Sequence, residues 1–112
     1  MIDRKKVYEK YGGRCAYCGN IILFENMQVD HKISKRDGGT DNEENLNPAC
    51  RTCNHYKRAF GIEGFRKRIS GLHERIKKSY TMKVAIRYGI LKITWQPFDG
   101  KFYFEKVKDG LL

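Results

Sequence analysis

Two pairs of cysteines have the residue type and spacing of a metal site. They are Cys15-x-x-Cys18 and Cys50-x-x-Cys53, separated by residues 19–49. Because a C-x-x-C turn presents two thiolates to one ion, two such turns complete a tetrahedral site of four thiolates. The alternatives are two disulfides, which the cytosolic location that we expect for the chain disfavours, and redox-active cysteines. The spacing therefore predicts a structural Zn²⁺ bound by all four cysteines.

An acid and a histidine, Asp30 and His31, lie between the two cysteine pairs. Cleavage of a phosphodiester at neutral pH needs a base that takes a proton from water, and the histidine side chain suits that task. A divalent ion held by oxygen ligands neutralises the charge on the phosphate and on the leaving group. We therefore interpret His31 as the base, and Asp30 and Asn54 as ligands of Mg²⁺ or Mn²⁺. His55 is the rival ligand, but a helical step of about 100° would turn it away if Asn54 faces the ion.

The adjacency of Asp30 and His31 sets a geometric condition on a shared site. Met27–Asp30 alternates apolar and polar residues, which predicts a strand. Neighbouring side chains in a regular strand point to opposite faces. We therefore expect His31 at a strand end or at a local distortion. A regular ladder with the two side chains opposed would contradict the shared site.

The first half of the chain predicts the elements that position these residues. Residues 3–11 favour a short helix with Asp3 as its N-cap, stopped by Gly12-Gly13. Residues 34–47 are polar and aperiodic, which indicates a long loop of the kind that often carries function. A helix is expected from the second cysteine pair to Phe60, with Asn54, Lys57 and Arg58 on one face.

The second half predicts helices followed by a change of period. Apolar residues spaced three and four apart over 62–76 predict an amphipathic helix, interrupted by glycines. A further short helix is expected to end at Gly89. Alternation over 91–104 around Pro97 and Asp99-Gly100 predicts a β-hairpin, with Trp95, Phe102 and Phe104 in a small core. Together these elements predict an α+β fold in a single domain spanning residues 1–112.

The charge of the chain favours a nucleic-acid partner. There are 23 Lys and Arg residues against 13 Asp and Glu residues, a net charge of +10. A basic protein without such a partner is the alternative. Residues 51–92 concentrate the cations, and we interpret them as a phosphate-binding surface; its candidate contacts are Lys57, Arg58, Arg66 and Lys67. Phosphate contacts carry no sequence information, so weak sequence specificity is expected. No apolar run is long enough for a membrane span or a signal peptide, hence the expected cytosolic location.

The order of these motifs resembles the HNH endonuclease family in its four-cysteine, zinc-containing form. The run Val29-Asp30-His31-x-Ile33, Gly38-Gly39, Asn45-Leu46 and Cys50-x-x-Cys53-Asn54-x-x-Lys57 carries the resemblance, over about residues 15–60. The resemblance implies a ββα-metal core, and we interpret residues 61–112 as a basic helical and hairpin extension of it. The resemblance also implies His31 as general base, Asn45 orienting it, and Asp30 and Asn54 on the catalytic ion. Asn54 stands where the family name has a histidine, as in HNN variants.

The function that this resemblance implies is metal-dependent endonuclease cleavage of DNA, typical of small phage and bacterial proteins. Two alternatives remain open at this point. One is a zinc-stabilised DNA-binding module that does not cut, which explains the cysteines and the charge but not Asp30, His31, Asn45 and Asn54 together. The other is a nuclease subunit active only with a partner, such as a phage packaging complex. The sequence does not indicate an oligomeric state or a preferred DNA structure.

Overall fold

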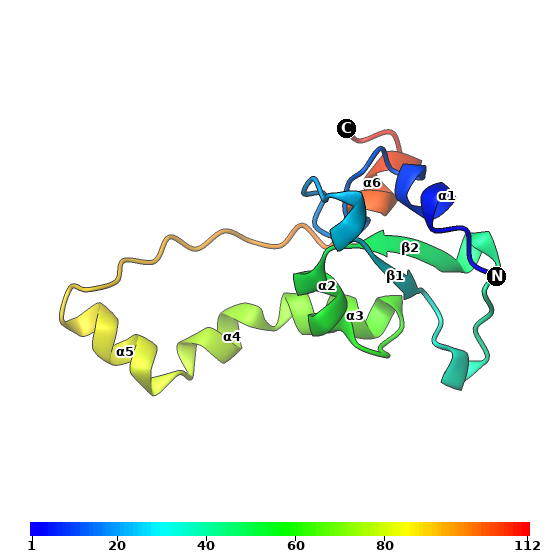
Figure 1. The fold of residues 1–112 in the computed structure, drawn as a ribbon. Coiled ribbons are helices and arrows are strands. Elements are labelled where there is room, and N and C mark those ends of the chain that lie inside the picture. The colour runs from blue at the N-terminus through cyan, green and yellow to red at the C-terminus, as the bar shows by residue number, and fades with distance from the viewer.

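A computed structural model describes all residues 1–112, in an α+β arrangement (Figure 1). The fold class predicted from the sequence is confirmed. The helices are α1 (Arg4–Glu9), α2 (Arg51–Lys57), α3 (Ile62–Ser70), α4 (Leu72–Lys77), α5 (Tyr80–Arg87) and α6 (Tyr103–Lys108), and the strands are β1 (Gln28–His31) and β2 (Leu46–Ala49). None of the helices combines the length and apolar character that a membrane span needs.

The two strands form one antiparallel sheet that carries the predicted site residues. Their register pairs Asp30 with Asn47 and His31 with Leu46. The connection between them, residues 32–45, contains two short 3-10 turns, at Lys35–Asp37 and Glu43–Asn45, within the polar stretch that predicted a loop. Every residue of β2 is buried. His31 is therefore the last residue of a short strand, and the loop begins at the next residue.

Helices α1 and α2 begin as the sequence predicts, but α2 ends earlier. The Asp3 side chain accepts a hydrogen bond from the Lys6 amide and caps α1. The Cys50 sulfur accepts one from the Cys53 amide at the start of α2. The helix stops at Lys57 rather than Phe60, because Arg58 adopts a φ of 54° that no α-helix can continue.

The amphipathic segment after Gly61 forms two helices rather than one. The break lies at Gly71, which ends α3 and starts α4. Glycine is a poor helix former, so the chain can change direction there at low cost. Helix α5 begins at the Ser79 cap and ends before Gly89, as expected.

The predicted β-hairpin over residues 91–104 is wrong. Residues 91–99 run without regular secondary structure, and Tyr103–Lys108 form α6. The Phe102 amide donates to the Glu105 carboxylate, a helix-starting contact that local alternation of aromatic residues does not reveal. The backbone amides of Tyr103 and Phe104 donate to the carbonyls of Tyr17 and Ala16, so this segment pairs with the first cysteine turn instead of with residues 91–95.

The aromatic core joins the C-terminal segment to the motif region. Tyr17, Phe65 and Phe102 are buried, and their rings pack with centroids 5.1–5.3 Å apart. The expected core role therefore holds for Phe102. It does not hold for Trp95, which is 42% exposed and contacts the His73 ring.

A long arm projects from this body. We define the arm as residues 71–97, which include α4, α5 and the extended return segment; Figure 1 shows α5 at the end farthest from the sheet. The arm stretches the molecule to 52 × 29 × 28 Å and a radius of gyration of 16.3 Å. A compact chain of this length would have a radius of gyration of about 13 Å. Most arm side chains are exposed, so the arm is available to a partner.

Candidate metal centre and catalytic site

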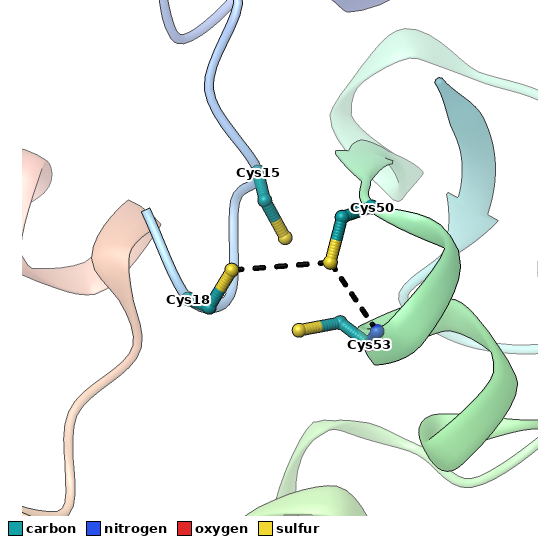
Figure 2. Close-up of side chains that lie close together, drawn as sticks. All are labelled: Cys15, Cys18, Cys50 and Cys53. Carbon is teal, nitrogen blue, oxygen red and sulfur yellow. Dashed lines mark hydrogen bonds between the residues drawn. The ribbon is translucent and has the colours of Figure 1, made fainter. Parts of the chain in front are cut away.

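The four cysteines converge on one point between the first turn and the start of α2 (Figure 2). Their sulfur atoms all lie within 4.8 Å of one another, and Cys18 Sγ and Cys50 Sγ are 3.9 Å apart. A tetrahedral zinc with Zn–S bonds of about 2.3 Å requires sulfur separations of about 3.8 Å. The sulfur positions and the thiolate chemistry therefore fit a structural Zn²⁺, as the spacing predicts.

Local backbone geometry shapes each cysteine turn. The Gly19 amide donates to the Cys15 carbonyl, and Gly19 adopts a φ of 79° that favours glycine. The amides of Tyr17 and Cys53 donate to the sulfurs of Cys15 and Cys50. The Ala16 amide donates to the Pro48 carbonyl, so the first turn is fastened to β2. Zinc at this point would tie the first turn, β2 and α2 together.

The thiol pKa values show why this cluster needs a cation. A hydrogen bond from the Cys53 thiol lowers the pKa of Cys15 to about 4, and the same bond raises the pKa of Cys53. Burial raises the pKa of Cys18 to about 11. Because thiolates this close repel one another, all of them can ionise together only around a positive ion.

His31 is the last residue of β1, and its ring faces the loop that follows. Its Nε2 lies 2.7 Å from Asp41 Oδ1, and the side chain is 23% exposed. Nδ1 has no hydrogen-bond partner in the protein. The other oxygen of Asp41 accepts from Lys35 Nζ at 3.0 Å. The hydrogen bond with His31, together with Lys35, lowers the pKa of Asp41.

Asp30 lies in a different environment from His31. Its carboxylate is 4% exposed, accepts a hydrogen bond from the Tyr17 hydroxyl, and pairs with Lys57 Nζ at 3.1 Å. Lys57 Nζ also donates to the His31 carbonyl at 3.1 Å. Burial raises the pKa of the Asp30 carboxyl, an effect that Tyr17 and Lys57 oppose. These contacts form a buried cluster that fastens α2 to the end of β1.

The structure gives only partial support to a divalent ion shared by Asp30 and His31. His31 does lie at a strand end, but the antiparallel register runs unbroken through both residues. Their side chains contact different groups, and both Asp30 oxygens are already paired. In this position Asp30 does not fit a divalent ion, because the Lys57 ammonium already neutralises its carboxylate. It could bind an ion only if the Lys57 ammonium moved away.

Asn45 and Asn54 occupy the two other positions expected in the site. Asn45 makes no hydrogen bond to the His31 ring; its side chain instead bonds the backbone of Ile33 and Thr40, both within the loop. Asn54 lies half-buried on α2, one turn before Lys57. Its side chain has no hydrogen-bond partner in the protein, which leaves its amide oxygen available.

Two of the four residues expected to contact phosphate, Lys57 and Arg66, are bound to acidic side chains of the protein instead. The Lys57 side chain is 1% exposed, so its expected surface role is wrong. Arg66 makes paired hydrogen bonds to Glu105 at 2.7 and 2.6 Å and to Glu63, so it holds α6 against α3. Arg58 and Lys67 remain exposed.

Asp41 and Tyr17 are the functional candidates that the sequence did not reveal. Asp41 is one acid among several in the loop, and only the fold brings it to His31. Tyr17 lies between two cysteines, where zinc spacing draws attention away from its hydroxyl. No local pattern distinguishes either residue, because both contacts join distant parts of the chain.

Comparison with known proteins agrees with this geometry. Residues 15–60 match the family model described as HNH endonuclease, the same range that carries the motifs. The family prediction is therefore confirmed for this region.

A curated relative is the CRISPR-associated endonuclease Cas9 of Corynebacterium diphtheriae. It is 36% identical to this chain over 55 residues, which cover 48% of the chain and 5% of the relative. The chain thus corresponds to a small segment of that much longer protein.

Proposed function

We propose that this protein is a metal-dependent DNA endonuclease that hydrolyses phosphodiester bonds. The observation that carries the proposal is the position and the accessibility of the His31 ring. The ring lies at the strand end of an HNH-type core, reaches solvent, and keeps Nδ1 free of protein partners. A neutral imidazole with a free ring nitrogen can take a proton from an attacking water.

In this proposal, His31 removes the proton as the water oxygen bonds to phosphorus, and a phosphorus–oxygen bond on the far side breaks. A divalent ion supplies charge neutralisation when bound, and Mg²⁺ or Mn²⁺ suits oxygen ligands. Asn54 is our proposed ligand, with its amide oxygen available on α2. Asp30 joins the ligand set only after release from Lys57. The zinc site fixes the positions of β2 and α2 but takes no part in the chemistry.

The arm is our proposed DNA-binding surface. It carries six cations and a single acid, Glu74; the cations are Arg75, Lys77, Lys78, Lys83, Arg87 and Lys92. All six are exposed. Tyr80 and Tyr88 are also exposed, at 79% and 75%, and can pack against sugars or bases. A large excess of positive charge on an extended, accessible element favours a polyanion.

Salt-dependent binding tests the arm. Lys83→Gln with Arg87→Gln should weaken binding of a fluorescent duplex and reduce the salt slope by about two units. Lys5→Gln with Lys108→Gln is the matched control, since both residues are exposed cations outside the arm. Equal salt slopes in the two double variants would exclude the arm as the binding surface.

Nicking of supercoiled plasmid with added Mg²⁺ or Mn²⁺ tests the activity itself. Metal-dependent nicking by the zinc-loaded protein would support the proposal. Tight DNA binding without nicking would favour the non-cleaving module. Nicking only after addition of a packaging or other partner protein would favour the partner-dependent subunit.

A further inference from the structure

Hydrogen bonds within the loop between β1 and β2 hold its first and last residues together. Asn45 Nδ2 donates to the carbonyls of Ile33 and Thr40 at 3.0 and 2.8 Å, and Asn45 Oδ1 accepts from the Ile33 amide at 2.9 Å. The Gly39 amide donates to the Ser34 carbonyl at 2.8 Å. A Cβ on Gly39 would lie 1.7 Å from the Ile33 carbonyl oxygen, so this closure requires glycine.

Closure of the loop determines where Asp41 lies. Asp41 follows Thr40, whose carbonyl is held by Asn45, and its carboxylate reaches back to His31 at 2.7 Å. Lys35, from the other side of the loop, holds the second carboxylate oxygen at 3.0 Å. The carboxylate is thus fixed from both sides, although the side chain is 40% exposed.

The chemistry of the contact selects one form of the histidine. An ionised carboxylate only accepts hydrogen bonds, so the His31 nitrogen that faces it must carry the proton. The neutral ring is then protonated on Nε2, and Nδ1 keeps its lone pair. Since Nδ1 has no partner in the protein, it is the nitrogen that can accept a proton from water.

We propose that Asp41 is the positioning residue for His31, fixing its ring orientation and its tautomer, and that Asn45 acts on His31 through the loop that carries Asp41. This inference rests on the proposed nuclease function for its catalytic consequence. The contact itself can be tested without activity.

The tautomer of His31 is the direct test. Long-range proton–nitrogen NMR at about pH 8.5, above the ordinary histidine pKa of roughly 6.5, reports which ring nitrogen carries the proton. We expect Nε2–H in the wild type and a mixture of tautomers in Asp41→Ala. Glu44→Ala is the matched control, because it removes an exposed acid of the same loop. An Nε2–H population unchanged by Asp41→Ala would overturn the proposal.

Kinetics supply the second readout. Asp41→Ala should lower kcat by about 10- to 100-fold, as loss of an orienting partner does, with little change in KM for DNA. Glu44→Ala should change neither value. An unchanged kcat in Asp41→Ala, with the melting temperature preserved, would also overturn the proposal. Failure of the nuclease function itself would be seen separately, as an inactive wild type or an active His31→Ala.

Discussion

Replacement of Lys57 by methionine should be among the most destabilising single changes in this chain. Methionine keeps much of the volume of the side chain but removes the ammonium that pairs with Asp30 and bonds the His31 carbonyl. Asp30 is 4% exposed, so its charge would be left buried without a cation. Removing one partner of a buried ion pair costs about 3–5 kcal/mol.

That cost is large beside the total stability. A chain of 112 residues typically has a free energy of unfolding of about 6–17 kcal/mol. With a urea m-value of about 2 kcal/mol/M, the unfolding midpoint of Lys57→Met should fall by about 1.5–2.5 M. Urea titration followed by circular dichroism, with zinc present throughout, measures this shift.

Two comparison variants separate burial from pairing. Lys101 pairs with Asp109 at 2.8 Å, a shorter distance, but both side chains are more than 40% exposed. Lys101→Met should therefore be much less destabilising than Lys57→Met. Adding Asp30→Asn to Lys57→Met removes the stranded charge while keeping an oxygen for Tyr17, and should recover part of the loss. If Lys57→Met cost no more than Lys101→Met, the buried cluster would not stabilise the fold as argued.

The zinc site and the Arg66–Glu105 pair give two further predictions. Cys53→Ser should lose both the zinc and cooperative unfolding, since structural zinc contributes about 10–16 kcal/mol of binding energy. Metal analysis and circular dichroism measure the two effects. His55→Ala is the control and should retain the zinc. Hydrogen bonding to Arg66 lowers the pKa of Glu105 in the folded state, so its stabilisation is present above the unfolded-state pKa of about 4.3 and is lost as the pH falls below it. The stability difference between wild type and Glu105→Gln, from urea titrations between about pH 6 and 3.5, should therefore shrink with acidification, and a constant difference would contradict this assignment.

The parts of the fold that could be predicted depend on short-range signals. The cysteine spacing, the Asp3 cap and the alternation before Asp30 each act within a few residues, and the structure reproduces all three. The order of the motifs further predicts where the sheet and α2 lie in the chain. Together they were sufficient to place His31 at a strand end.

The parts that could not be predicted depend on contacts between distant residues. Lys57 looked like a surface cation because nothing in α2 shows that Asp30 lies beneath it. Phe102 and Phe104 alternate as strand residues do, yet their backbone pairs with the Tyr17 turn and α6 begins there. Asp41 lies beside His31 in a loop whose Thr40 carbonyl is held by Asn45, five residues further along the chain.

The central claim is that His31 is the base of a DNA-cutting site. It is tested most directly by single-turnover cleavage of a labelled duplex by zinc-loaded protein with Mg²⁺ or Mn²⁺, comparing His31→Ala with His55→Ala. His55 is an exposed histidine on α2, which makes it the matched control. The account predicts that His31→Ala slows cleavage by about 10²- to 10⁴-fold while His55→Ala cuts at the wild-type rate. Equal cleavage rates for His31→Ala and the wild type would contradict it.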